Sequence, residues 1–385
     1  MVPDPIFSRT AHGRRTVGAG LKTPWWIVPI EDRSRAWKRH LDRLLLPNSL
    51  PCRECGQPAD YRLCPSCHRH LPDSAVTLRS AQVVVVGPES VGKTTFLSVL
   101  INELDNHVGP DLGFVLSTVT DETRERYARD YHDQTYGLSD LGVGDERARR
   151  HSHAPTLSLK VDRSILDPLV FQGNRAKRSG AILSFFDTSG EDWEENLDLL
   201  RNEAEYVGRA KGLLFLIDPL RLRAVAHDPR LHLTEKERRV PLADYLNDIR
   251  KLATFFPNTP TKTPLAIVLN KLDRWGRLLP KGTKLYEWAC GVPESRPSLG
   301  LDQAIHDEVQ SALRHWGATG FLEHLDVHFP NHRCFACSTL GDAAQDRDDE
   351  PQPLPTPLLV ERPVLWLLRK QKVMDQLESR RPGPR

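Results

Sequence analysis

The chain has 385 residues, of which 27% are charged and 39% hydrophobic, with a formal net charge of +2 at pH 7. This length suffices for two or three domains with a sizeable buried core. No apolar run approaches the roughly 18 residues of a membrane-spanning helix, and the N-terminus lacks a secretory apolar core, so we expect a cytoplasmic protein without a membrane span. Four of the seven cysteines lie in one short cluster, which argues against a disulfide framework.

Residues 1–50 are predicted to form a basic arm that ends in a short amphipathic helix. The first 30 residues are rich in Pro, Gly and Arg, with Trp25-Trp26 as the only apolar feature. From Glu31 to Leu46, apolar residues recur on one face, basic residues occupy the others, and Pro47 ends the pattern. We expect the apolar face to pack on the neighbouring domain rather than on a membrane, because one short helix binds lipid weakly. The basic character of this part leaves an acidic or nucleic-acid partner open.

Residues 51–72 carry two C-x₂-C pairs separated by eight residues. Each pair places two thiolates on one tight turn, so the four can converge on a tetrahedral Zn²⁺. The string also resembles the short zinc ribbons attached to many bacterial and archaeal proteins, which implies a structural or interaction module. A site closed by four cysteines does not favour catalysis at the zinc. The predicted zinc ligands are Cys52, Cys55, Cys64 and Cys67.

A strand that starts near Ala81 runs through four valines into a glycine-framed loop with the pattern G-x-x-x-x-G-K-T. Such a loop wraps a diphosphate with its amide N–H groups, while Lys93 supplies charge to the β- and γ-phosphates and Thr94 a hydroxyl to Mg²⁺. The next segment repeats apolar residues at helical spacing, so a helix N-terminus also faces the phosphates. The residues expected to contact nucleotide here are Gly87, Glu89, Ser90, Val91, Gly92, Lys93, Thr94 and Thr95.

A polar insertion is predicted at residues 107–154, with a helix only at Asp121–Tyr131. Two strands follow, Thr156–Val161 and Ala181–Phe186, and the second ends in the sequence Asp-Thr-Ser-Gly. A carboxylate at such a strand end supports Mg²⁺ through water, which is the role predicted for Asp187. The N–H of Gly190 can meet a γ-phosphate, which is the basis of a switch.

The remaining chain alternates strands and helices. With the elements above, this alternation predicts an α/β fold with a doubly wound, mostly parallel sheet over residues 78–376, and a ligand at the carboxyl ends of the strands. The expected elements are helix 193–207, strand 212–217, a charged insertion at 221–240, helix 242–256, strand 264–269, helix 301–316, strand 328–336, an insertion at 340–357 and helix 364–377.

The motifs of the chain resemble, in their order, those of a Ras-like P-loop GTPase of the translation-factor-related class. They are GPESVGKT, a threonine, DTSG, NKLD and a small polar turn. The resemblance implies GTP and GDP as ligands, because the Asp of this family's NKxD motif accepts from guanine N1–H and N2–H₂. Asp273 would then select guanine over adenine, which disfavours an ATPase, while Asn270 and Lys271 brace the loop. Ser338 would stand near the guanine.

Two features depart from the family pattern. Glu191 follows the DTSG motif where small GTPases usually have a water-orienting Gln, so we expect slow hydrolysis without a partner. Lys93, Gly190 and Glu191 are the candidate catalytic residues, with Glu194, Arg124 or His153 as alternatives if Glu191 turns away. The switch threonine that would contact Mg²⁺ is Thr156, with Thr118 and Thr120 left open.

The long switch segment, the insertions and the N-terminal ribbon look more like the bacterial double-GTPase families, which are thought to act as paired GTPases in conflict or signalling systems. This resemblance implies a GTP-dependent switch with a protein partner, which could be a second GTPase. The alternative hypothesis is a nucleic-acid-associated factor, in which the ribbon and basic arm bind RNA or DNA and GTP regulates them.

Overall fold

The structure, a computed structural model, divides the chain into two compact units. The first comprises residues 1–80 with 173–178, and the second residues 81–172 with 179–385. No helix in the described parts of either unit is long and apolar enough to cross a membrane. The structure describes residues 6–8, 61–63, 70–71, 79–112, 114–118, 124–125, 127–136, 156–163, 180–187, 205–208, 210–256, 260–291, 299–341 and 355–373.

The described part of the first unit is a small antiparallel sheet with the strand order β1-β2-β3. Strand β1 spans Ile6–Ser8, β2 Tyr61–Leu63 and β3 His70–Leu71. Strands β2 and β3 pair directly, so the chain between them, which carries the second C-x₂-C pair, connects two neighbouring strands. The four predicted zinc ligands and the helix predicted at residues 31–46 lie outside the described residues.

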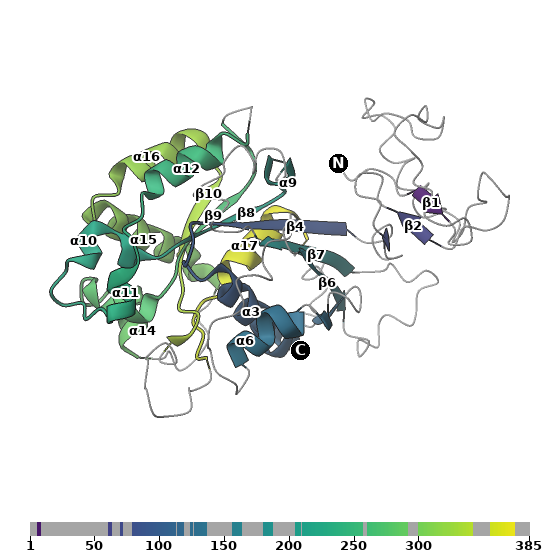
Figure 1. Ribbon diagram of the computed structural model, residues 1–385, viewed down its shortest axis with the longest axis horizontal. Coiled ribbons are helices and arrows are strands. Elements are labelled where there is room, and N and C mark those ends of the chain that lie inside the picture. The colour runs from purple at the N-terminus through teal and green to yellow at the C-terminus, as the bar shows by residue number, and fades with distance from the viewer. Residues whose placement is uncertain are drawn as a thin grey trace, which may run out of the picture. The chain divides into compact units, whose positions relative to one another are not determined.

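The second unit is built on a seven-stranded sheet with the order β10-β9-β8-β4-β7-β6-β5 (Figure 1). Strands β10, β9, β8 and β4 are parallel to their neighbours in that series, whereas the pairs β7–β6 and β6–β5 are antiparallel. The predicted α/β fold with a mostly parallel sheet is confirmed. The strands span Arg79–Val86 (β4), Phe114–Thr118 (β5), Thr156–Arg163 (β6), Gly180–Asp187 (β7), Leu213–Ile217 (β8), Leu265–Leu269 (β9) and His332–Ala336 (β10).

The centre of this sheet is covered on both faces. Every residue of β8 and β9 is buried, and so are the four valines that end β4. Continuous apolar runs of this kind are typical of parallel strands that have helices on both sides, because neither face can be polar. The hydrophobic runs in the sequence thus become the core beneath the strands' carboxyl ends.

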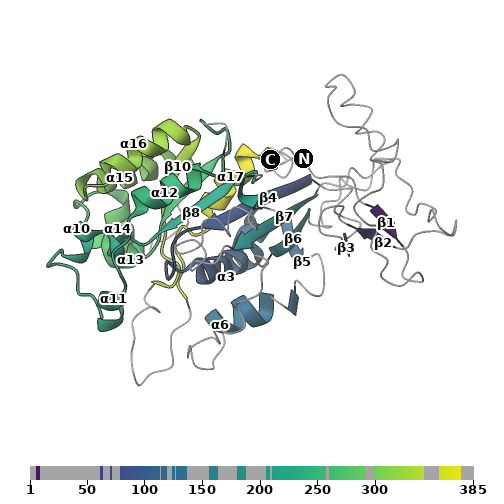
Figure 2. The ribbon, with the colours of Figure 1, turned by 45° about the horizontal axis from the view of Figure 1, so that its top comes forward.

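Helix α3 lies on one side of the sheet, and α12 and α16 lie on the other (Figure 2). The apolar residues of α3 predicted from helical spacing are buried, as expected of the face turned to the sheet. The α-helices are α3 (Lys93–Glu103), α4 (Gly109–Leu112), α6 (Asp133–Tyr136), α9 (Glu205–Gly208), α10 (Arg223–Ala226), α11 (Glu235–Arg239), α12 (Tyr245–Ala253), α13 (Leu272–Trp275), α14 (Lys284–Cys290), α15 (Asp302–His315), α16 (Thr319–His328) and α17 (Arg362–Lys370). The π- and 3₁₀-helical turns are η3 (Leu104–Val108), η4 (Ala128–His132), η7 (Pro219–Arg221), η8 (Gly276–Leu278) and η9 (Leu299–Leu301).

The structure corrects several predicted boundaries. The last strand begins at His332 rather than at residue 328, because α16 continues through His328. The helix predicted at 242–256 begins only at Tyr245, after the exposed Leu242, and α17 ends at Lys370 rather than at residue 377. Strand β5 lies within the insertion at 107–154, whose described residues also contain the turns η4 and α6 near the predicted helix. The helix predicted at 193–207 is described only at α9.

Candidate functional site

The loop between β4 and α3 is shaped by two glycines. Gly87 has a φ of 150°, and a Cβ there would lie 2.8 Å from the carbonyl oxygen of Leu216 on the neighbouring strand β8. Gly92 has a φ of 86° and immediately precedes α3. Both backbone conformations are unfavourable for residues with a Cβ, which explains the glycines of the motif physically.

Lys93 closes this phosphate-binding loop from inside. Its Nζ donates to the carbonyl oxygens of Gly87 and Pro88, each at 2.8 Å, and the side chain is buried. The ammonium is therefore held in the concavity of the loop. Thr94 and Thr95 lie partly exposed in the first turn of α3, where the positive end of the helix dipole favours an anion.

A second loop follows β9 at the same edge of the sheet. The side-chain Oδ1 of Asn270 accepts from the Lys271 N–H at 2.8 Å and from the Thr339 hydroxyl at 2.7 Å. The Asn270 carbonyl accepts from Trp275 Nε1 at 2.7 Å, and Trp275 is fully buried. Lys271 adopts a left-handed backbone conformation with a φ of 62°. These bonds fix the conformation of the loop before any ligand binds.

The segment after β10 completes this second loop. The Ser338 hydroxyl donates a short hydrogen bond to the Asp273 carboxylate and accepts from the Gly341 N–H at 3.1 Å. The Leu272 N–H donates to the Cys337 carbonyl at 2.9 Å. Burial, with the Asp273 charge nearby, raises the pKa of the Cys337 thiol, so the thiol stays protonated. Asp273 is thus oriented by a neighbouring hydroxyl.

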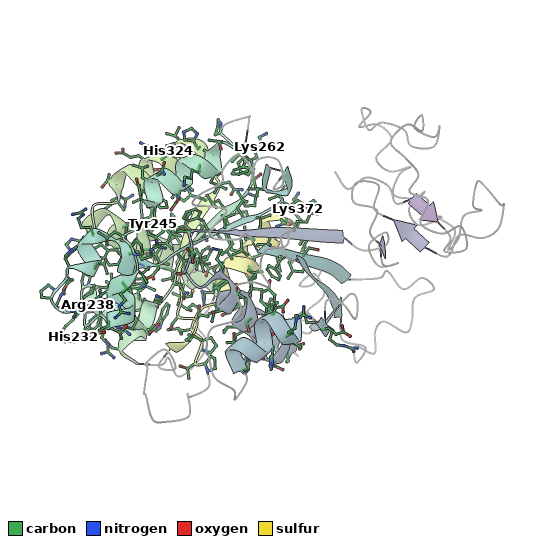
Figure 3. All side chains as sticks on the ribbon, viewed as in Figure 1. His232, Arg238, Tyr245, Lys262, His324 and Lys372 are labelled. Carbon is green, nitrogen blue, oxygen red and sulfur yellow. The ribbon has the colours of Figure 1, made fainter. Side chains whose placement is uncertain are left out.

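The two loops meet. The amide Nδ2 of Asn270 lies 3.4 Å from where a Cβ on Gly92 would stand, so the second loop abuts the phosphate-binding loop. The Lys271 ammonium forms a 2.8 Å ion pair with the buried Asp218, at the end of β8. The hydroxyl of Tyr245, labelled in Figure 3, donates to the Asp218 carbonyl at 2.9 Å, and its burial beside this carboxylate raises the pKa of the phenol. Four strand ends, β4, β8, β9 and β10, therefore contribute to one site.

The predicted Mg²⁺ and catalytic residues are placed only in part. Thr156 begins β6, and the register places it opposite Phe186, next to Asp187 at the end of β7. Thr118 ends the edge strand β5, one strand farther from β7. Among the described residues, no group of three or more His, Cys, Asp or Glu side chains is arranged to hold a metal. The side chains of Thr156 and Asp187, and the residues Thr120, His153, Gly190, Glu191 and Glu194, lie outside what the structure describes.

The sequence analysis missed two supports of this site, Asp218 and Tyr245. Asp218 carried a signal, because it ends an apolar strand as Asp187 does. Tyr245 carried none, since its partner lies 27 residues away in sequence. Thr339 belongs to the small polar turn after β10, but its bond to Asn270, 69 residues away, has no local signal.

Comparison with known proteins assigns the chain to a family. A family model described as Double-GTPase 2 matches residues 81–333, which is more than half of the 385 residues. The chain belongs to the Double-GTPase 2 family. The resemblance to double GTPases is confirmed, and the P-loop and the second loop described above lie within the matched range except for the segment after β10. Membership supports guanine-nucleotide binding by a P-loop GTPase domain.

Three matches to individual proteins have low sequence identity to this Double-GTPase 2 member. A Mycolicibacterium smegmatis protein, described as a candidate ESX-1 scaffolding and assembly protein, SaeC, is 24% identical over 288 residues, which are 69% of this chain and 68% of the relative. Two structures of the S. cerevisiae Ski7 GTPase-like domain, bound to GDP and inorganic phosphate or to GTP, are 14% identical with TM-scores of 0.34 and 0.35. Each match covers 78% of this chain, which spans about half the length of those structures, 51%. The family assignment therefore rests on the family model.

Proposed function

We propose that the protein is a GTP-binding switch that hydrolyses GTP slowly with Mg²⁺ and acts with a protein partner. The observation that carries the proposal is the contact between the two loops, with Asn270 beside Gly92. One loop has its lysine and helix N-terminus arranged for phosphates, and the other has an oriented carboxylate. A nucleotide carries both the phosphates that suit the first loop and a base whose N–H groups suit the carboxylate of the second.

At the phosphate end, Lys93 offsets the charge of the β- and γ-phosphates, and the α3 N-terminus contributes N–H donors. A hydroxyl from Thr94 and a carboxylate from Asp187 are the hard oxygen donors that suit Mg²⁺. β7, which ends at Asp187, lies next to β4 in the sheet, so both donors follow neighbouring strands. When bound, Mg²⁺ neutralises charge on the phosphate oxygens. Thr156 is our candidate for the switch threonine.

At the base end, Asp273 is proposed to accept from guanine N1–H and N2–H₂. Ser338 already donates to this carboxylate, which limits its rotation and presents its remaining lone pairs in a fixed direction. Adenine offers no matching pair of donors, and a buried acceptor left unpaired costs enough to discriminate strongly.

We propose that hydrolysis is slow because of Glu191. A carboxylate after the DTSG motif would face the negative γ-phosphate, and like charges oppose the pose that orients the attacking water.

A partner, such as a second GTPase subunit, would supply an arginine or reposition the loop. The description of the mycobacterial relative as a scaffolding and assembly protein supports a protein partner over a nucleic-acid one. We place this switch in the cytoplasm.

Nucleotide binding is tested by titrating the full chain with GTP, GDP and ATP, with and without Mg²⁺. We expect binding of GTP and GDP over ATP, loss of binding in Lys93→Ala, and loss of the Mg²⁺ dependence in Thr94→Ala. Lys262→Ala is the matched control, because Lys262 is exposed (Figure 3). Unchanged GTP affinity and hydrolysis in both site variants would remove the proposal.

Hydrolysis is tested by single-turnover assays of the wild type and Glu191→Gln. We expect a wild-type rate on the order of 10⁻⁴ to 10⁻² per second and a faster Glu191→Gln variant. A wild-type rate of several per second that Glu191→Gln leaves unchanged would show that Glu191 is no obstacle and that no activating partner need be invoked.

A further inference from the structure

Three consecutive carbonyl groups of the phosphate-binding loop are held by two different cations. Lys93 Nζ binds the carbonyl oxygens of Gly87 and Pro88 from inside the loop. The next carbonyl, that of Glu89, instead accepts from Nη1 of Arg221 at 2.7 Å. Arg221 lies 132 residues further along the chain, at the end of η7. The backbone of the loop is thus held by two cations from distant parts of the chain.

Arg221 is itself held in place. Its Nε donates to the Pro241 carbonyl at 2.9 Å, and its own carbonyl accepts from the Ala243 N–H at 3.1 Å. Only 6% of the residue's surface is exposed. A guanidinium is planar with its donors in a fixed fork, so anchoring Nε also fixes the direction of Nη1. The position of the Glu89 carbonyl therefore follows from contacts outside the loop.

The direction of that carbonyl determines the direction of an amide. In a trans peptide unit the C=O and the following N–H point in opposite directions, because the unit is planar. If the Glu89 oxygen faces Arg221, the Ser90 N–H faces away from it. Ser90 has a φ of 61°, and a left-handed residue within such a loop lets successive N–H groups converge on an anion.

We propose that Arg221 is a positioning residue that aims the Ser90 N–H at the nucleotide phosphates by holding the Glu89 carbonyl. The inference rests on the proposed function only in that it requires a nucleoside diphosphate, with guanine or adenine as its base, in the P-loop. It gives the segment that follows β8 a part in phosphate binding, through its hydrogen bond to the backbone of the loop.

The test is calorimetric titration of the full chain with GDP and with ADP. Arg221→Met keeps the length and apolar stem of the side chain but removes its donors, and we expect it to bind GDP roughly ten- to a hundredfold more weakly, as for one lost hydrogen bond to a charged group. Arg221→Lys keeps one charged donor and should recover part of the affinity. Arg223→Met is the matched control, because Arg223 is exposed at the start of α10, and it should bind as the wild type does.

The outcomes separate positioning from packing. Wild-type affinity in Arg221→Met, or an equal loss in Arg221→Met and Arg221→Lys, overturns the inference, because the donor would then be irrelevant. If Arg221→Met does not fold, Arg221→Gln, which retains one neutral donor, replaces it and should bind more weakly than Arg221→Lys. Tighter binding of ADP than of GDP by the wild type would overturn the proposed guanine specificity, yet the same ranking of variants with ADP would still support Arg221.

Discussion

At the scale of single residues, Asp273 is the side chain that we propose recognises the base. Its carboxylate would accept two guanine donors, and Ser338 holds it in place. Asp273→Asn replaces one acceptor with a donor, so we expect GDP affinity to fall by about a hundredfold or more. Xanthosine diphosphate, which carries a carbonyl where guanine has its amino group, should bind better to the variant than to the wild type. Comparing both affinities by titration checks this, with Asp307→Asn as an exposed carboxylate control. An unchanged preference for GDP would rule out Asp273 as the base-recognising residue.

His306 predicts how stability depends on pH. Its Nδ1 accepts from the Cys334 N–H at 3.0 Å, and burial, with His332 and Arg333 nearby, lowers the pKa of the imidazole. The unfolded state therefore binds a proton at His306 below the ordinary histidine pKa of about 6.5, whereas the folded state binds it only at lower pH. The contribution of neutral His306 to the free energy of unfolding is complete above that pH and is lost as the pH falls through the lower folded-state pKa.

We expect the free energy of unfolding, measured with urea, to be lower at pH 5.5 than at pH 7.5. His306→Asn, which keeps an acceptor but cannot titrate, should show a smaller decrease. His315→Asn, at an exposed position on the same helix, should keep the wild-type decrease. Equal decreases in all three proteins would mean that His306 does not titrate as described.

At the scale of elements, the charged insertion at 221–240 is bonded to the second loop of the site, which follows β9. Arg274, the residue after Asp273, donates through Nη2 to the His232 carbonyl at 2.8 Å and to Glu237 Oε2 at 3.0 Å. The side chains of Arg274 and Glu237 are only 17% and 18% exposed. Glu237 also forms a capping box with Thr234 at the start of α11. One carboxylate thus joins a five-residue helix, which is too short to be stable alone, to the candidate site.

Glu237→Gln should therefore loosen α11. We expect a loss of about 1 kcal/mol in unfolding free energy and faster tryptic cleavage after Arg238 and Arg239. Glu235→Gln is the matched control: its ion pair with Arg239 is 3.6 Å long, with the two side chains 90% and 82% exposed, so it should change little. Equal cleavage rates in the two variants would show that the Glu237 contacts do not stabilise the helix.

The elements that sequence alone predicted are those with strong local patterns. The buried strands β4, β8 and β9 appear as apolar runs bounded by Gly, Asp or Asn, and α3 shows helical spacing after its motif. Strand β5 was not predicted, because its five residues lie in a polar insertion and pair with residues of β6 that are 41 to 49 positions away in sequence. The site was predicted where a motif names its residues. Its supports, such as Arg221 on the P-loop, depend on contacts between distant segments, which no local pattern encodes.

At the scale of the whole molecule, the division into two compact units makes the zinc hypothesis separable from the nucleotide site. Four thiolates in two C-x₂-C pairs suit Zn²⁺. Cys64 and Cys67 lie in the sequence between β2 and β3, which pair with each other. No alternative cluster of three or more metal-binding side chains occurs in the described residues. The large apolar core lies within residues 81–373, so the nucleotide unit has its own source of stability.

We therefore expect about one zinc per chain, lost in the double variant Cys64→Ser with Cys67→Ser and retained in the control Cys290→Ser, which alters an exposed free cysteine. Because Zn–thiolate binding supplies folding energy to so small a module, zinc removal should increase proteolysis of residues 1–80. GDP affinity should stay unchanged, since none of the predicted zinc ligands belongs to the second unit, which contains the P-loop. A zinc-selective chelator in excess Mg²⁺, followed by elemental analysis, limited proteolysis and GDP titration, measures all three. Protein purified without chelator that contains no zinc would exclude the metal site, and GDP binding lost together with zinc would show that the two units are not independent.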